Sequence, residues 1–170
     1  NLTALKNDAD ILVQHFLDSL SCVLALDQQA KTLIDIGPGA GFPSLPLRVV
    51  VPHLSCALVE ARRKKARFLA ELLKTIALPG TTVINQRIES PELHHLRGEF
   101  DVATARAVAK TATTLEYTLP FVRLGGQVIL QKGKNVHEIK QADHALARLG
   151  GAVESTRKLK LPFQRQTRHL

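Results

Sequence analysis

The chain has 170 residues, of which 45% are hydrophobic and 22% are charged. A chain of this size buries roughly two thirds of its unfolded surface, so the composition predicts one globular domain over residues 1–170 and excludes a wholly disordered chain. The net charge of +8 indicates a polyanionic partner, most often nucleic acid.

Targeting and redox signals are few. No run of about 18 apolar residues occurs, and the first ten residues are polar and mixed, so we expect no membrane span and no signal peptide. Cys22 and Cys56 lack the spacing of a disulfide framework or a metal site, and free thiols fit a reducing cytoplasm. Because the sequence contains no methionine, we expect it to be part of a longer protein.

Short apolar runs alternate with amphipathic stretches along the chain. In chain order, the expected elements are a helix from an Asp8 or Asp10 cap to Leu26, a strand Thr32–Ile36, a helix from Pro43, a strand Ser55–Val59, a helix Arg62–Ala77, strands Thr81–Ile84 and Phe100–Ala105, a helix Thr111–Val122, a turn at Gly125-Gly126, a strand Gln127–Gln131, a helix Val136–Leu149, an edge strand within Val153–Leu161 and a strand beginning at Arg168. This alternation predicts an α/β fold, with a doubly wound, mostly parallel sheet and helices on both faces.

The segment between the first strand and the next helix is rich in glycine. Gly37, Gly39 and Gly41 occupy alternate positions, which allows a tight turn and close approach to a ligand. Phe42 stands where the dinucleotide fingerprint G-x-G-x-x-G has its third glycine, and no Gly-Lys-Ser/Thr of a phosphate loop follows. The spacing therefore favours a nucleoside such as S-adenosylmethionine over a dinucleotide, with an ordinary glycine turn as the alternative.

Acidic residues follow the next two strands. Glu60 comes about twenty residues after the loop, where an acid can accept hydrogen bonds from ribose hydroxyls. The alternative is a helix-terminal carboxylate that the helix dipole favours. We expect Ile88-Glu89 at the end of the third strand, where Ile88 would stack on an adenine and Glu89 would face its edge.

Short motifs in a fixed order run along nearly the whole chain. They are Asn1-Leu2-Thr3, His15-Phe16-Leu17-Asp18-Ser19-Leu20, Asp35-Ile36-Gly37-Pro38-Gly39-Ala40-Gly41-Phe42-Pro43, Lys64-Lys65-Ala66-Arg67-Phe68-Leu69, Gln86-Arg87-Ile88-Glu89, Phe100-Asp101, Ala105-Arg106-Ala107 and Lys132-Gly133. Together they resemble the bacterial glucose-inhibited division protein B family, the 16S ribosomal RNA guanine-N7 methyltransferases.

The resemblance implies a Rossmann-like class I methyltransferase fold, S-adenosyl-L-methionine as cofactor, and 16S ribosomal RNA or the small ribosomal subunit as partner. It places the cofactor at Gly37, Phe42, Ile88, Glu89 and Arg106. Family members usually carry a helical segment before the Asn-Leu-Thr motif and a further C-terminal strand, so we expect both to be missing here. We further expect a cytoplasmic monomer.

Guanine N7 carries no proton, so its methylation needs alignment and a dry pocket rather than a general base. We accordingly expect neither a catalytic triad nor a metal. Arg106 is the first catalytic candidate, since arginine can pair with guanine O6, phosphate or the cofactor carboxylate, with a structural ion pair as the alternative. Lys132 is expected at the cleft edge as a phosphate or base contact. His15, Asp18 and Ser19 share one helical face, which either lines the cleft or only packs the helix.

Two basic stretches fit an RNA partner. Arg62-Arg63-Lys64-Lys65-Ala66-Arg67 opens a helix, where cations oppose the helix dipole and RNA phosphates would compensate them. Residues 157–170 contain five more Lys and Arg and no acid, which predicts a second contact.

Two other classes remain open. A nicotinamide-dependent oxidoreductase would share the fold and the acid after the second strand, although the glycine spacing disfavours it. A non-catalytic RNA-binding module on the same fold would keep its RNA affinity without Gly39 or Glu60. Within methyltransferases, no Asp/Asn-Pro-Pro-aromatic motif follows the fourth strand, where Thr104-Ala105-Arg106-Ala107 stands instead. That absence agrees with a ring-nitrogen target.

Overall fold

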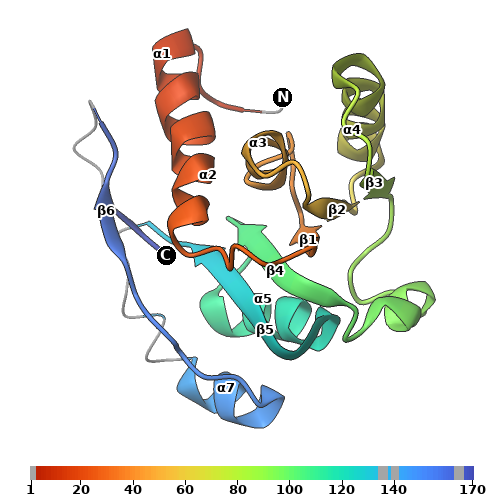
Figure 1. Cartoon of the computed structure of the whole chain (residues 1–170), viewed down its shortest axis with the longest axis vertical. Coiled ribbons are helices and arrows are strands. Elements are labelled where there is room, and N and C mark those ends of the chain that lie inside the picture. The colour runs from red at the N-terminus through yellow and green to blue at the C-terminus, as the bar shows by residue number, and fades with distance from the viewer. Residues whose placement is uncertain (1–2, 134–137, 139–141, 163–166) are drawn as a thin grey trace.

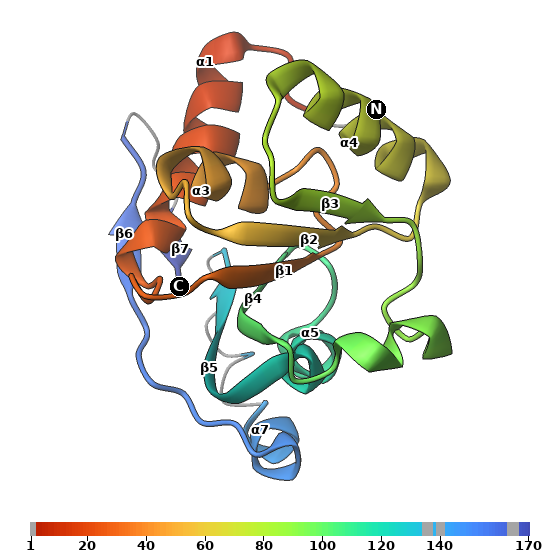
Figure 2. The same ribbon diagram turned by 45° about the vertical axis from the view of Figure 1, so that its right-hand side comes forward.

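The computed structural model describes residues 3–133, 138, 142–162 and 167–170. Its centre is a five-stranded parallel sheet in the order β3-β2-β1-β4-β5. The strands are β1 (Thr32–Ile36), β2 (Ser55–Val59), β3 (Thr81–Ile84), β4 (Phe100–Arg106) and β5 (Val122–Gln131). Figures 1 and 2 show helices on both sides of this sheet, which confirms the predicted doubly wound α/β class.

One face of the sheet is covered by the N-terminal helical segment and by α3 and α4 (Figure 1). The N-terminal segment consists of α1 (Asp8–Ile11), the π-helical turn Leu12–Leu17, α2 (Asp18–Leu20) and the 3₁₀ turn Ser21–Leu24, and it is followed by α3 (Ser44–Val50) and α4 (Arg63–Ile76). Leu33, Leu58 and Leu69 are fully buried in the core on this side.

The other face is covered by the 3₁₀ segment Pro91–Leu96, α5 (Thr111–Thr118) and the 3₁₀ turn Leu119–Phe121. Ile34, Ala103 and Phe121 belong to this second core, and α7 (Asp143–Leu149) packs against α5. Leu33 and Ile34 thus enter different cores, because successive side chains of a strand point to opposite faces.

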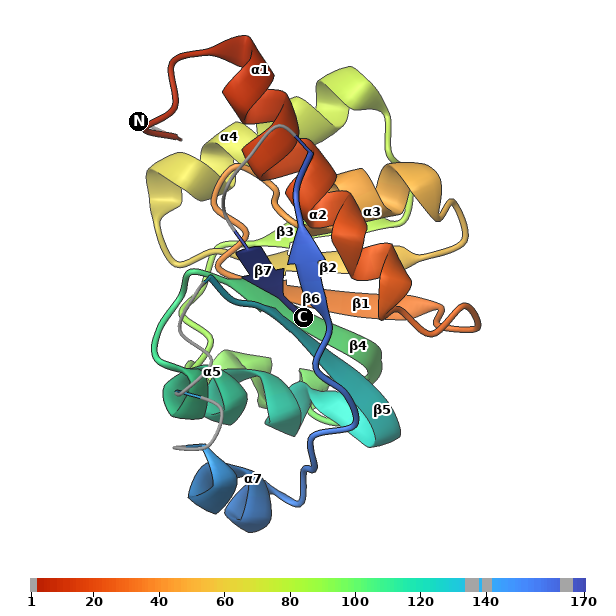
Figure 3. The same cartoon turned by 90° about the vertical axis from the view of Figure 1, so that its left-hand side faces the viewer.

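The C-terminus forms a separate antiparallel ribbon of β6 (Lys158–Lys160) and β7 (Thr167–His169). His169 pairs with Lys132, directly after β5, through two backbone hydrogen bonds of 2.9 Å. Figure 3 shows the ribbon beside the N-terminal helices. The described part of the chain contains no helix that is long and apolar enough to cross a membrane.

Several predicted boundaries were wrong. The N-terminal helix is capped by Asn7, not by Asp8 or Asp10, and its winding changes three times before Leu24. The predicted helix Thr111–Val122 gives way to a 3₁₀ turn after Thr118. The predicted turn at Gly125-Gly126 lies inside β5, which begins at Val122.

The predicted edge strand within Val153–Leu161 is only three residues long and pairs outside the main sheet. The predicted strand at Arg168 begins one residue earlier, at Thr167. Part of the predicted helix Val136–Leu149 and the first two residues of the Asn1-Leu2-Thr3 motif lie outside the described residues.

Candidate active site

The glycine loop lies at the carboxyl end of β1, where the strand order reverses between β1 and β4. Ligands of open parallel sheets bind at this position. Gly37, Gly39 and Gly41 all have positive φ, at 67°, 61° and 99°. A Cβ on Gly41 would lie 2.3 Å from Leu45 Cδ1, whereas a Cβ on Gly39 would meet only Lys65 Nζ, at 3.7 Å. Gly41 therefore closes the turn, and Gly39 leaves space beside the loop.

Asp35 holds the glycine loop through a hydrogen bond to the residue that follows it. Its carboxylate is fully buried at the end of β1, and Oδ2 accepts a hydrogen bond from the backbone N–H of Ser44, at the start of α3 (3.2 Å). Burial raises the pKa of Asp35 to about 7. The bond spans the glycine loop and holds its two ends together.

Glu60 follows β2 directly and joins the loop to α4. Its Oε2 accepts the N–H of Gly39 (3.2 Å), and its Oε1 accepts the N–H of Arg62 (2.8 Å). The side chain is 5% exposed. Each carboxylate oxygen has a second lone pair, so Glu60 can still accept hydrogen bonds from a ligand while it fixes the loop.

Ile88 and Glu89 do not end the third strand as predicted, because β3 stops at Ile84 and a loop carries both residues. Ile88 is buried in the core on the side of the sheet that α5 covers. Glu89 is exposed, and its own backbone N–H is the largest of the contacts that lower the pKa of its carboxyl group; Tyr117 and Arg87 add to the effect. The buried Ile88 and the exposed Glu89 therefore lie next to each other in the loop that follows β3.

His15 links the N-terminal helix to the glycine loop. Its ring stacks on Phe42, with centroids 5.0 Å apart, and Phe16 meets the same phenyl ring edge-on. Nδ1 lies 3.2 Å from Arg106 Nη2, and Nε2 lies 2.7 Å from Thr3 Oγ1. Arginine only donates, so Nδ1 accepts and the Nε2–H donates to Thr3. Burial and then Arg106 lower the pKa of His15, which keeps the ring neutral.

Arg106 ends β4 and is held by the N-terminal helix. Its Nη2 donates to the Gln14 carbonyl (2.7 Å) and to His15, and lies 3.4 Å from Asp18 Oδ2. Nη1 is buried and has no hydrogen-bond partner among the described residues. One side of the guanidinium is thus fixed, and the donor capacity of Nη1 on the other side is unused among the described residues.

Asp18 is shared by two arginines. Oδ2 accepts from Arg168 Nε of β7 at 3.0 Å while it also faces Arg106, and the carboxylate is 1% exposed. Gln131, at the end of β5, donates to the Asp18 backbone carbonyl (2.6 Å). Two cations therefore face one buried carboxylate.

The remaining predicted residues have internal partners. Ser19 is fully buried, and its hydroxyl donates to the His15 carbonyl (2.5 Å), which matches the helix-packing alternative. Lys132 follows β5 by one residue. Its Nζ lies 3.4 Å from Glu138 Oε2 and donates to the Ala109 carbonyl (3.3 Å). Glu138 also accepts from the Thr111 hydroxyl (3.0 Å), so Lys132 is tied to the start of α5.

The basic run at the start of α4 borders the same loop. Lys65 reaches Gly39, and Arg62, Arg63, Lys64 and Arg67 are exposed. None of these five cations makes an ion pair with a described residue. The run therefore brings uncompensated positive charge to the rim of the site.

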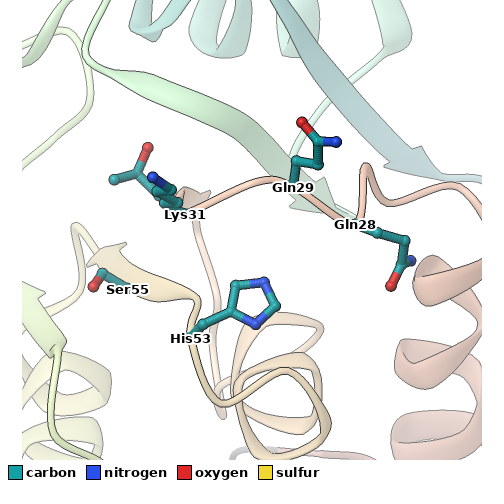
Figure 4. A pocket seen from close by; sticks show the side chains of 6 residues that line it. Gln28, Gln29, Lys31, His53 and Ser55 are labelled. Atoms are coloured by element: carbon teal, nitrogen blue, oxygen red, sulfur yellow. The ribbon is translucent and has the colours of Figure 1, made fainter.

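A separate depression of about 710 Å³ lies at the opposite edge of the sheet (Figure 4). It is lined by Gln28, Gln29, Lys31, Thr32, His53 and Ser55. Thr32 and Ser55 are the first residues of β1 and β2, so this depression is at the amino ends of the strands and is separate from the glycine loop. The described residues contain no group of three or more His, Cys, Asp or Glu arranged to hold a metal.

The model of the family "GidB: rRNA small subunit methyltransferase G" matches residues 1–170. The chain belongs to this family. It is 42% identical to the Ribosomal RNA small subunit methyltransferase G of Leuconostoc citreum over 95% of this chain and 70% of that protein. It is 41% identical to the protein of the same name from Caldanaerobacter subterraneus, over 100% of this chain and 72% of that protein. The family resemblance predicted from the sequence is thereby confirmed.

Solved structures agree on the fold. A SAM-dependent methyltransferase from Aquifex aeolicus superimposes with a TM-score of 0.68 at 14% identity, over 94% of this chain and 90% of that one. TYW2 of M. jannaschii, solved in complex with AdoMet, gives 0.70 at 16% identity, over 91% and 72%. The Rossmann-like methyltransferase fold predicted from the sequence is confirmed.

Sequence reasoning missed three residues of the site: Thr3, Gln131 and Arg168. Thr3 and Arg168 lay within segments that the sequence singled out, as part of the first motif and of the basic C-terminal stretch. Gln131 carried no local signal, because its role depends on contact with a helix more than 100 positions earlier in the chain.

Proposed function

We propose that this protein transfers a methyl group from S-adenosylmethionine to N7 of a guanine in 16S ribosomal RNA, and that the carboxyl edge at β1 and β4 is its active site. The observation that carries this proposal is the buried Nη1 of Arg106, which has no hydrogen-bond partner among the described residues and lies beside the glycine loop at the switch point of the sheet. Membership of the rRNA methyltransferase G family supports the substrate class.

The residues present fit the cofactor. Gly39 leaves open space beside the loop, and Glu60 retains acceptor capacity suited to ribose hydroxyls. Gly37, Gly41 and Phe42 shape the loop, and Ile88 and Glu89 would flank the adenine. The Nη1 of Arg106 offers a buried donor to a carboxylate. S-adenosylmethionine, when bound, supplies the methyl group on an activated sulfonium.

Arg106 would contact the reacting groups, by donating to guanine O6, a phosphate or the cofactor carboxylate. His15, Asp18 and Ser19 act as positioning residues, since they hold the other side of the guanidinium and the helix turn that carries it. Lys132 would release Glu138 to meet an RNA phosphate. No side chain has to remove a proton from N7, so alignment and exclusion of water account for catalysis.

The start of α4 would contact the RNA backbone. Cations in the first turn of a helix oppose its dipole, and no acidic partner compensates these within the described structure. Phosphates would compensate them. We also infer that the protein acts in the cytoplasm and that it is a monomer. Sedimentation of the full-length protein would test its oligomeric state. Its two free cysteines are buried.

The test is transfer of labelled methyl to 16S RNA, or to small subunits, from a strain that lacks this activity, with the full-length protein. Digestion should yield 7-methylguanosine. Arg106→Ala should abolish transfer, Arg106→Lys should lose at least 100-fold because it lacks the planar fork, and Arg97→Ala, an exposed arginine at the opposite edge of the sheet, should be normal. Binding of cofactor without RNA labelling would contradict the substrate, and label on another base would contradict N7.

A further inference from the structure

The ribbon of β6 and β7 has two different faces. In its register, Leu159 pairs with Arg168, while Lys158 pairs with His169 and Lys160 with Thr167. Paired residues share a face of an antiparallel ribbon. Arg168 donates to Asp18, so its face, with Leu159, is turned toward the protein. Lys158 and Lys160 therefore share the other face, which is called the outer face here because both lysines are exposed, although His169, which pairs with Lys158, is buried.

The outer face is basic and unneutralised. Lys158 and Lys160 on this face are exposed, and so is the preceding Arg157, which pairs with Leu170 and belongs to the other face. None of the three forms an ion pair with a residue that the structure describes. No Asp or Glu occurs in the sequence after Glu154. The two lysines are two positions apart on one strand, roughly 6.6 Å along it, which arranges them in a row.

The ribbon is fixed next to the catalytic edge. The backbone of His169 pairs with that of Lys132, directly beyond the carboxyl end of β5. Arg168 bonds to the same Asp18 carboxylate that faces Arg106. The ribbon is thus attached at two points to the elements that hold the site, and Figure 3 shows it lying along the N-terminal helices.

We propose that the outer face of this ribbon, marked by Lys158 and Lys160, is an RNA-binding arm that holds backbone phosphates of the substrate next to the methylation site. The inference rests on the proposed function for the identity of the RNA. Each lysine that contacts a phosphate releases a condensed counterion, so the arm contributes to affinity in a salt-dependent and sequence-independent way.

The experiment compares two double variants of the full-length protein that remove equal charge. Lys158→Gln with Lys160→Gln alters the arm, and Lys31→Gln with Arg97→Gln alters two exposed cations near the amino ends of the strands. Binding of fluorescent 16S RNA is measured between 50 and 300 mM salt, in roughly the range where phosphate contacts dominate. A third variant, Lys158→Arg with Lys160→Arg, keeps the charge.

The arm variant should bind RNA about tenfold more weakly, and its slope of log affinity against log salt should be shallower by about 1.4, or about 0.7 for each contact to a single strand. Its kcat and its affinity for S-adenosylhomocysteine should be unchanged. The arginine variant and the control should match the wild type. An arm variant with wild-type affinity, or a control variant that is weakened equally, would overturn the proposal.

Two further outcomes separate this proposal from the function on which it rests. If the wild-type protein binds RNA through the arm but forms no 7-methylguanosine, the proposed function fails and the arm stands. If the arm variant is impaired only with assembled subunits and not with protein-free RNA, the partner is an acidic protein surface, and the RNA-binding arm is refuted.

Discussion

Arg106 owes its setting to residues that are far apart in the chain. Gln14, His15 and Asp18 hold its Nη2, and Arg168 shares Asp18 with it. The motifs around Arg106 and His15 could be recognised in the sequence, but their contact could not, because 91 positions separate them. A fixed guanidinium suits a reaction that depends on alignment, since little ordering remains to be done when the substrate binds.

Two glycines of the loop should respond differently to the same substitution. Gly41→Ala places a Cβ against the buried Leu45 at a φ of 99°, so it should lower the free energy of unfolding by about 3 kcal/mol or more. Gly39→Ala meets open space and should cost only the strain of its left-handed backbone, about 1–2 kcal/mol. Urea unfolding measures both.

The same two variants should also differ in their affinity for the cofactor product. Gly39→Ala should lose most of its affinity for S-adenosylhomocysteine in calorimetry, because the new methyl group occupies the space beside the loop. Equal stability losses in the two variants, together with intact binding in Gly39→Ala, would show that Gly39 does not face the ligand.

At the scale of elements, buried strands were the easiest to predict. β1 and β2 begin and end where their apolar runs do, since both strands lie in the centre of the sheet and are buried on both faces. β5 was predicted too short because Gly125-Gly126 is usually a turn signal. Gly126 is instead inside the strand, where a Cβ would lie 2.7 Å from the Asp101 carbonyl, so glycine is needed for close packing.

The N-terminal helix and the loop with Ile88 and Glu89 were harder. The π-helical turn Leu12–Leu17 carries His15, and the contacts of His15 with Phe42 and Arg106 are tertiary. No local sequence pattern therefore predicts this turn. Gln86-Arg87-Ile88-Glu89 follows the apolar Val83-Ile84 closely in the sequence, but pairing with β2 ends at Ile84. The family resemblance predicts that both segments belong to the site, whereas periodicity alone did not give their conformation.

The start of α4 should show opposite effects on stability and on RNA binding. Arg63→Ala with Lys64→Ala removes two exposed cations that oppose the helix dipole, so the free energy of unfolding should rise by about 1 kcal/mol. The KM for RNA should also rise several-fold. Lys74→Ala near the other end of the same helix loses a favourable pair with Glu71, so it should lower stability slightly and leave KM unchanged. A rise in stability without a change in the KM for RNA would show that the start of α4 does not contact RNA.

At the scale of the whole molecule, the sheet order brings the glycine loop of β1 and Arg106 of β4 together at one switch point. The same arrangement buries Asp35 completely between the sheet and α3. A charged group that is withdrawn from water in this way links the stability of the entire domain to pH.

Burial raises the pKa of Asp35 from 3.8 to about 7, so the folded state binds the proton more tightly than the unfolded state does. Its contribution is fully present below about pH 4 and is lost as the pH rises to 7, by about 4 kcal/mol at about 1.4 kcal/mol per pH unit. Asp35→Asn removes this term, so the difference in unfolding free energy between variant and wild type should change by that amount between pH 4 and 7. If the difference in unfolding free energy stayed constant between pH 4 and 7, the pKa of Asp35 would not be raised in the folded state.

The central claim is that the loop and Glu60 form the cofactor site, and calorimetric titration of S-adenosylhomocysteine into the full-length protein tests it most directly. Glu60→Gln should weaken binding about tenfold or more, which corresponds to about 1.4 kcal/mol, because it removes the charged acceptor beside Gly39. Glu71→Gln, on the exposed surface of α4, should bind like the wild type. An absence of binding to the wild type, or equal affinity in Glu60→Gln, would contradict the account.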